Sequence, residues 1–462
     1  MNNENTVNKN IIRLSRIFIV MFLSLIIMNS YWAIWREKDL TSMVQNPRNR
    51  EKLNLRGKIL GRDGTVFARS EKKKRLYPQE ELTSHITGYL SPLLGKTGLE
   101  DTCDDILRSH AFPFSIEGFK ERWLEGHPKG YNIYLTIDSN LTKVAYDALG
   151  NNRGAVVAIK PQTGEILVMV TKPGFDNNNL EKNWKVYQKD SNYPLLDRTV
   201  QGSYAPGSIF KVLILCAALQ EGVVKESDTF DCPGYTDIDG HRFHCSHTHG
   251  HQTLRQALSN SCNVAFSSIG LKLGKENLLK YFDDFFGHYY NIKLPVLHSK
   301  LTEKNLFSNT LIAQTSFGQG ELAITPFEAC LIASAVANKG KIMYPLLIKE
   351  IRDSKNRIIE KKESHVMAEC ISTKTAETVA SMMEAVVTEG TGYRAYIEGI
   401  PVAGKTGTAE HPGGANNAWF IGFAPVENPE IAVAVIVEEG GTGGESAAPI
   451  AGEVMKSYLE NK

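Results

Sequence analysis

Ser208 and Lys211 form a serine–lysine pair that could carry out nucleophilic chemistry. They lie in the run Tyr204-Ala-Pro-Gly-Ser-Ile-Phe-Lys-Val, where Pro206-Gly207 can begin a helix and an apolar stretch follows. Positions three apart share one face of a helix, so Lys211 should lie one turn from the serine hydroxyl. A serine becomes a nucleophile when a base takes its proton. A lysine can be that base if burial and nearby positive charge lower its pKa.

Ser261 and Asn263 form an S-x-N motif between two predicted helices, residues 254–259 and 264–273. Ser261 could relay a proton between the lysine and a leaving group, and the Asn263 amide could donate a hydrogen bond to a substrate carbonyl. An S-x-N triplet alone carries little information, so its weight depends on the motifs around it.

Lys405-Thr406-Gly407-Thr408 lies on a predicted strand late in the chain. The lysine can attract a substrate carboxylate and the threonines can hydrogen-bond it. Gly407 has no side chain, so an extended substrate could approach the strand edge. The backbone N–H groups of Ser208 and Thr408 would then form an oxyanion hole. A second K-T-G triplet, within residues 95–98, precedes the serine and is followed by a helix start, so we discount it.

Five strand candidates fall into two groups that are far apart in the sequence. Short turns join the members of each group, and such neighbours usually pair antiparallel. We therefore expect an α+β fold in which a five-stranded antiparallel sheet is flanked by helices, with a long and mostly helical segment between the groups. The candidates are residues 154–160, 165–171, 401–409, 418–424 and 430–437.

An uncharged apolar stretch over residues 17–35 predicts a transmembrane helix, since its length of about 28 Å matches the hydrocarbon thickness. Lys9, Arg13 and Arg16 precede it, which predicts a cytoplasmic N-terminus and an extracytoplasmic remainder. A cleaved signal peptide is the alternative, but no A-x-A-like site follows the stretch. A buried core helix is disfavoured because the stretch has no polar face.

The chain of 462 residues is long enough for more than one domain. We predict a cytoplasmic tail (1–16), an anchor (17–35), a small mixed non-catalytic domain (36–135) and a catalytic domain (136–462). Arg56 to Ser70 should form a hairpin about Asp63-Gly64. The 52 basic and 51 acidic residues nearly balance, which argues against a nucleic-acid partner.

Cys232, Cys245 and Cys262 lie close to several histidines in a polar, glycine-containing loop. Three thiolates and one imidazole are a common ligand set for structural zinc, and a metal would help such a loop to order. His249 and His251 both remain candidates for the fourth ligand. A disulfide between Cys232 and Cys245, or a merely buried Cys262, would explain the same residues. Such a ligand set leaves no open position for catalysis, and the serine chemistry itself requires no cofactor.

The order serine–S-x-N–K-T-G resembles that of the penicillin-binding proteins and β-lactamases. The rest of the chain resembles the class B penicillin-binding proteins in particular. The resemblance rests on an uncleaved anchor, Arg56-Gly-x-Ile, Asp197-Arg-Thr, Gln314-Thr-Ser-Phe-Gly-Gln-Gly and Trp419-Phe-Ile-Gly. It also favours His249 over His251, because His249 begins a His-Gly pair similar to one in relatives.

This resemblance implies a peptidoglycan D,D-transpeptidase of division or elongation, on the cytoplasmic membrane. Ser208 would attack the D-Ala-D-Ala carbonyl of one stem peptide, and an amine of a second would resolve the acyl-enzyme. β-Lactams would mimic the donor and remain bound to Ser208 as covalent inhibitors. A lipid-II polymerase of the SEDS family is the partner that the resemblance implies.

Two other functions fit parts of the pattern. A D,D-carboxypeptidase or β-lactamase would use the same serine with water as acceptor, although the predicted anchor and extra N-terminal domain disfavour a free lactamase. A non-catalytic β-lactam sensor or scaffold should carry a cytoplasmic signalling domain, and only about 16 residues precede the predicted span.

Overall fold

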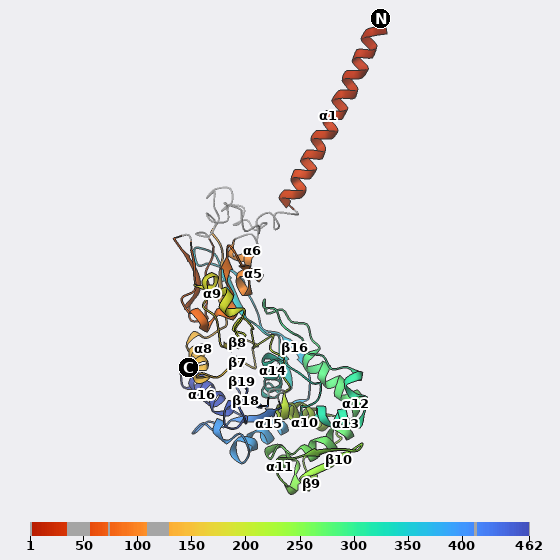
Figure 1. The fold of residues 1–462 in the computed structure, drawn as a ribbon, viewed down its shortest axis with the longest axis vertical. Coiled ribbons are helices and arrows are strands. Elements are labelled where there is room, and N and C mark those ends of the chain that lie inside the picture. The colour runs from red at the N-terminus through yellow and green to blue at the C-terminus, as the bar shows by residue number, and fades with distance from the viewer. Residues whose placement is uncertain (1, 35–55, 73, 109–128, 411–413, 462) are drawn as a thin grey trace.

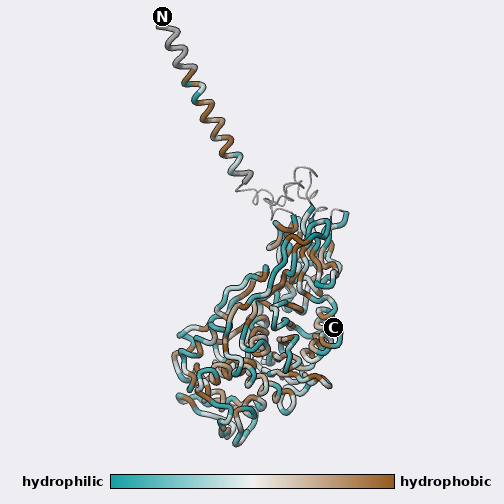
Figure 2. Tube along the Cα trace, turned by 180° about the vertical axis from the view of Figure 1, so that it is seen from behind, coloured by the Kyte–Doolittle hydropathy of each residue, from teal (hydrophilic) through white to brown (hydrophobic). Residues whose placement is uncertain are grey.

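The computed structural model describes residues 2–34, 56–72, 74–108, 129–410 and 414–461. Helix α1 (Asn2–Ile34) projects away from the rest of the molecule as a rod (Figure 1). The side chains of residues 12–31 are all exposed, and apolar residues dominate the middle of the rod (Figure 2). The segment Ile12–Tyr31 is long and apolar enough to cross a membrane, and it overlaps most of the predicted span; Trp35 lies outside the described residues.

A six-stranded sheet forms the N-terminal region, in the order β15-β14-β6-β1-β2-β3. Strands β1 (Ile59–Leu60) and β2 (Val66–Glu71) form the predicted hairpin, and Gly64 in its turn has a φ of +84°. The other members are β3 (Lys74–Leu76), β6 (Asn132–Leu135), β14 (Ile348–Arg352) and β15 (Ile358–Lys361). Short elements complete the region: η2 (Glu80–Leu82), α4 (Ser84–Thr87), β4 (Leu90–Ser91), β5 (Gly95–Lys96), α5 (Gly98–Thr102) and α6 (Asp104–Leu107).

Strands β14 and β15 come from the part of the chain that we assigned to the catalytic domain. They nevertheless extend the N-terminal sheet, because β14 pairs antiparallel with β6. The two regions therefore share a sheet as well as a chain connection.

Arg56 is part of a buried ion-pair network, which explains its place in the Arg56-Gly-x-Ile motif. Its guanidinium donates to the Glu100 carboxylate at 2.7 Å, and Arg75 donates to the same carboxylate at 2.6 Å. Burial raises the pKa of Glu100, but the charges of Arg75 and Arg56 outweigh that effect and hold the pKa below its usual value. A buried charge of this kind is tolerated only when paired, so the three side chains depend on one another.

The predicted five-stranded antiparallel sheet is confirmed, in the order β17-β18-β19-β7-β8. The strands lie within a few residues of the predicted ranges. They are β7 (Gly154–Ile159), β8 (Ile166–Lys172), β17 (Ala403–Ala409), β18 (Asn417–Ala424) and β19 (Ile431–Val437). Every residue of β18 and β19 is buried, because helices cover both faces of the sheet.

Helix α14 (Pro326–Ala337) packs on one face of this sheet, while α8 (Ser139–Ala148) and α16 (Ala447–Glu460) pack on the other (Figure 1). α14 begins with a capping box between Thr325 and Glu328 and has proline at its first position, both typical of a helix start. The residues of α14 are all buried, so this helix lies inside the hydrophobic core.

The prediction that the long middle segment is mostly helical is only partly right. Besides α14, its helices are α9 (Leu180–Tyr187), η3 (Gly207–Phe210), α10 (Lys211–Gln220), α11 (Leu254–Ser259), α12 (Asn263–Phe286), η4 (Glu303–Leu306), α13 (Asn309–Ser316), α15 (Thr373–Thr388) and η5 (Tyr393–Ala395). It also contains β9 (Thr229–Cys232), β10 (Tyr235–Ile238), β11 (His241–His244), β12 (Gly250–Thr253), β13 (Lys341–Met343) and β16 (Val366–Glu369). β10 and β11 bury no residue fully, and their sequences, Tyr-Thr-Asp-Ile and His-Arg-Phe-His, lack the apolar–polar alternation that identifies a strand.

Candidate active site

Ser208 lies in the tight turn η3, which leads directly into the buried helix α10. Gly207 has a φ of +55°, and its N–H donates to the Gly318 carbonyl at 2.9 Å. A Cβ on Gly318 would lie 1.8 Å from the Gly207 carbonyl oxygen, so only glycine fits where the two loops meet. The segment over residues 317–320, which follows α13, thereby holds the serine turn in place.

The Lys211 side chain is fully buried and joins the serine to the S-x-N motif. Its Nζ lies 3.0 Å from Ser208 Oγ and 3.2 Å from Ser261 Oγ. It also donates to the Ser261 carbonyl and to Asn263 Oδ1, each at 2.7 Å. One nitrogen thus contacts the nucleophile and the predicted proton relay, as the predicted roles require.

Burial controls the charge of both site lysines. Burial lowers the pKa of Lys211 to about 7. Burial and the Lys211 charge hold the pKa of Lys405 well below its usual value. Because the two ammonium groups share one serine hydroxyl, we treat them as a coupled pair that gives up a proton near neutral pH.

The S-x-N motif lies between α11 and α12. Ser261 has a φ of +55°, a left-handed conformation that is unfavourable for a non-glycine residue and that concentrates at functional sites. Asn263 is the first residue of α12; its Oδ1 accepts from Lys211 and its Nδ2 donates to the His244 carbonyl at 2.8 Å. The predicted hydrogen bond to substrate therefore depends on the second N–H of this amide.

Lys405 and its neighbours lie on β17, the outermost strand of the sheet. Lys405 Nζ is 3.0 Å from Ser261 Oγ, so the K-T-G and S-x-N motifs meet at one hydroxyl. Gly407 also makes room for the serine turn. A Cβ there would lie 3.0 Å from Ile209 Cγ2 and from the Pro206 oxygen, so a side chain at this position would crowd that turn. Gly207 lies similarly close to the Thr408 carbonyl.

Sequence reasoning missed two contributors behind β17. Thr391 Oγ1 lies 2.5 Å from Thr406 Oγ1, which places a third hydroxyl beside the two predicted to bind a carboxylate. A Cβ on Gly443 would lie 2.2 Å from the Trp419 oxygen and 2.4 Å from the Gly407 oxygen. The glycine-rich run over residues 440–444 could have signalled this close approach.

The discounted K-T-G triplet lies away from the site. Gly95 and Lys96 form the short strand β5, and Lys96 Nζ pairs with Asp104 at 2.8 Å. Gly98 packs against the Gly88 backbone, which explains the glycine without any catalytic role.

The four predicted metal ligands converge beside the S-x-N motif. Cys232 Sγ is 3.6 Å from Cys245 Sγ and 3.4 Å from His249 Nδ1, and Cys245 Sγ is 3.7 Å from Cys262 Sγ. All four ligand atoms lie within 4.8 Å of one another. His251 lies outside the cluster and contacts Asp231 at 2.9 Å.

This geometry fits a tetrahedral zinc ion. Zinc–sulfur bonds of about 2.3 Å place two thiolates about 3.8 Å apart, close to the observed spacing, whereas a disulfide needs about 2.05 Å. The Cys262 thiol, with N–H donors from Val264 and Asn263, lowers the pKa of Cys245 to about 5, and the same contact raises the pKa of Cys262, so this pair favours one thiolate, on Cys245. Those same N–H groups tie Cys245 to the start of α12.

A nucleophilic serine, two buried lysines and an edge strand on an α+β scaffold define a serine-acylating enzyme of the penicillin-binding type. The family model of the penicillin binding protein transpeptidase domain matches residues 154–456, and that of the penicillin binding protein A dimerisation domain matches residues 56–133. The chain belongs to the penicillin-binding protein family, and within it to the class B proteins.

Individual relatives agree with this assignment. Peptidoglycan D,D-transpeptidase PbpA of Mycolicibacterium smegmatis is 30% identical over 414 residues, which are 83% of this chain and 84% of that protein. Stage V sporulation protein D of Bacillus subtilis is 35% identical over 84% of this chain, which spans 64% of that protein. The ceftriaxone acyl-enzyme complex of penicillin-binding protein A from M. tuberculosis superposes with a TM-score of 0.81 at 28% identity, covering 88% of this chain and 99% of that one.

Replacing Gly318 tests whether its loop positions the nucleophile. Gly318→Ala should slow acylation by benzylpenicillin about 10²-fold, because the new Cβ displaces Gly207 and the serine turn with it. Gly399→Ala is the matched control. Like Gly318, Gly399 has a positive φ, of +74°, but the space around its Cβ position is open. Equal acylation rates in the two variants, measured with a fluorescent penicillin, would contradict this role.

Proposed function

We propose that this chain is a peptidoglycan D,D-transpeptidase that cross-links stem peptides through an acyl-enzyme on Ser208. The observation that carries the proposal is the position of Lys211 Nζ, within 3.2 Å of both Ser208 Oγ and Ser261 Oγ. A base that contacts the nucleophile and the proton relay at once can serve both halves of an acyl transfer.

Acylation begins when neutral Lys211 takes the Ser208 proton and the serine oxygen attacks the penultimate D-Ala carbonyl. The backbone N–H groups of Ser208 and Thr408 stabilise the oxyanion that forms. The tetrahedral intermediate collapses by breaking the peptide bond. The departing D-Ala nitrogen receives a proton through Ser261, which Lys211 and Lys405 both contact.

Transfer reverses these roles with a second substrate. The amine of another stem peptide attacks the ester carbonyl and loses a proton to the same lysine. The new amide forms as the bond to Ser208 Oγ breaks, and the serine regains its proton. No residue is consumed, so one site performs both half-reactions.

The donor is held by β17. The outer edge of this strand offers backbone groups to an extended peptide. The positive charge of the lysine pair and the hydroxyls of Thr406, Thr408 and Thr391 suit the C-terminal carboxylate of the donor. A stem peptide ending in D-Ala-D-Ala, or a β-lactam of the same shape, meets both requirements.

The alternatives differ in the acceptor and in the lifetime of the ester. A carboxypeptidase or β-lactamase would pass the acyl group to water, and a sensor would keep it without turnover. The relative named Peptidoglycan D,D-transpeptidase PbpA, which matches along 83% of this chain, favours an amine acceptor.

We further propose that α1 anchors the protein in the cytoplasmic membrane with its N-terminus inside. Lys9, Arg13 and Arg16 at one end of the apolar stretch support this orientation. A lipid-II polymerase of the SEDS family is the proposed partner, since a cross-linking enzyme needs new glycan strands at the same membrane.

Structural zinc is the third part of the proposal. Cys232, Cys245, Cys262 and His249 would hold it, and the metal would supply a rigid link between the β9–β12 loops and α12. Cys245 accepts N–H bonds at the start of that helix, and the neighbouring His244 carbonyl holds the Asn263 amide. These residues therefore orient Asn263 toward Lys211, and no chemical step involves the ion.

The transpeptidase proposal predicts a stable adduct of one benzylpenicillin per chain in the full-length protein, purified in detergent and analysed by intact mass. Ser208→Ala should form none, because the hydroxyl is the acylated group. Incubation with a D-Ala-D-Ala pentapeptide and an acceptor amine should yield a new amide and free D-Ala. An adduct that hydrolyses within seconds, or hydrolysis without an amide product, would instead support the water-dependent alternatives.

The zinc proposal predicts about one zinc per purified chain. Cys245→Ser should lose the metal and lower the unfolding temperature, whereas Cys103→Ala removes a buried thiol outside the cluster and should keep the metal. Zinc below about 0.2 per chain, with Cys232 and Cys245 oxidised together, would refute it.

A further inference from the structure

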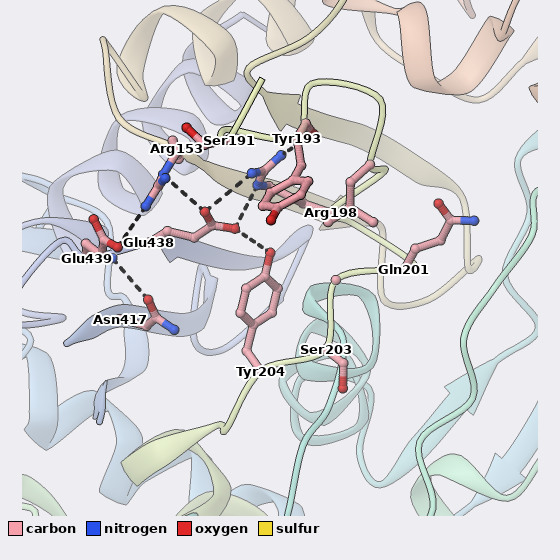
Figure 3. Close-up of a pocket in the computed structure, with 12 residues that line it drawn as sticks. Arg153, Ser191, Tyr193, Arg198, Gln201, Ser203, Tyr204, Asn417, Glu438 and Glu439 are labelled. Carbon is pink, nitrogen blue, oxygen red and sulfur yellow. Dashed lines mark hydrogen bonds and ion pairs between the residues drawn. The ribbon is translucent and has the colours of Figure 1, made fainter. Parts of the chain in front are cut away.

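A charged cluster lies beside the peptide segment that leads to Ser208. Figure 3 shows Glu438 between Arg198, Arg153 and the Tyr204 hydroxyl, on the wall of a cavity of about 370 Å³. Glu438 directly follows β19, and Tyr204 stands four residues before the nucleophile. The mechanism above uses none of these side chains.

The segment over residues 204–207, here called the serine strap, is held along its length. The Tyr204 backbone forms a pair of hydrogen bonds with Ile324, at 3.0 and 2.9 Å. The indole N–H of Trp419 donates to the Ala205 carbonyl at 3.1 Å. At the end of the strap, the Gly207 N–H donates to the Gly318 carbonyl.

Tyr204 connects this strap to the charged cluster. Its hydroxyl donates to Glu438 Oε1 at 2.7 Å, and its ring meets Trp419 edge to face at 6.0 Å. Trp419 pairs across the sheet with Gly407, next to Thr408. Tyr204 therefore contacts β18, the strand paired with β17, and β17 carries Thr408. Tyr204 also begins the serine strap, which leads to Ser208. Ser208 and Thr408 supply the two N–H groups of the proposed oxyanion hole.

Glu438 is itself held in one place. Arg198, only 1% exposed in its side chain, donates to the same oxygen at 2.7 Å. Arg198 also donates to the Asn192 carbonyl at 2.7 Å and to the Tyr193 carbonyl at 3.2 Å. The cavity thus offers a ligand little unpaired charge, and the cluster is better suited to positioning than to binding.

We propose that Glu438 is a positioning residue for acylation and that it acts through the Tyr204 hydroxyl. Fixing Tyr204 sets the distance between the N–H groups of Ser208 and Thr408, which must point at one developing oxyanion. A misplacement of about 1 Å in such a site has a large effect on rate. The inference rests on acylation of Ser208, as proposed above.

Tyr204→Phe tests it, because phenylalanine keeps the ring on Trp419 and removes only the hydroxyl. We expect the acylation rate constant with benzylpenicillin to fall about tenfold, equivalent to about 1.4 kcal/mol, while the non-covalent dissociation constant changes less than about twofold. Glu438→Gln should act in the same direction, and the double variant should be no slower than the slower single variant.

Tyr281→Phe is the matched control. Tyr281 is also buried and donates to a glutamate, Glu221, at 2.8 Å, but it lies in the C-terminal half of α12. The Tyr281→Phe variant should be acylated by benzylpenicillin at the wild-type rate even if its unfolding temperature falls. An unchanged rate in Tyr204→Phe, additive effects in the double variant, or an effect confined to the dissociation constant would overturn the inference. Failure of the wild type to acylate would instead refute the proposed function.

Discussion

The whole site depends on placing two lysine ammonium groups, both fully buried, within 3.2 Å of a single serine hydroxyl. Charged lysines avoid such surroundings, because desolvation and mutual repulsion both favour the neutral form. The protein can keep them there only by surrounding them with fixed acceptors, among them the Ser261 carbonyl and Asn263 Oδ1. Burial in this arrangement lowers the pKa of Lys211 to about 7 and so provides a base near neutral pH.

The fold brings the two lysines together from opposite sides. Lys211 begins the buried helix α10, and Lys405 stands on the edge strand β17. Glycines at positions 207, 318 and 407 let these elements approach more closely than side chains would allow. Cys245 in the cysteine cluster accepts hydrogen bonds from the start of α12. The position of the S-x-N motif therefore depends on a loop with little core of its own. Rigidity here comes from packing and hydrogen bonds outside the reacting groups.

The sequence predicted the five-stranded sheet and the three motifs that the structure brings together, because long apolar strands and motifs of fixed spacing leave strong local patterns. The sequence did not predict features that depend on contacts between distant segments. Strands β10 and β11 have no fully buried residue and no apolar–polar alternation in their sequences, and β14 pairs with β6, which lies more than 200 residues earlier in the chain. The contact of Gly407 with the serine turn, and the positions of Thr391, Tyr204 and Glu438, follow from three-dimensional proximity that no spacing encodes.

The pH dependence of acylation tests the central claim most directly. We would measure the second-order rate constant for benzylpenicillin on the full-length protein from pH 5 to 9, with unfolding followed in parallel. Since burial lowers the pKa of Lys211 to about 7, the base is protonated below that pH and neutral above it. The rate should therefore rise through a midpoint near 7 and reach a plateau. A rate that does not change with pH, or that is still rising at pH 9 toward the ordinary lysine pKa of about 10.4, would contradict the account.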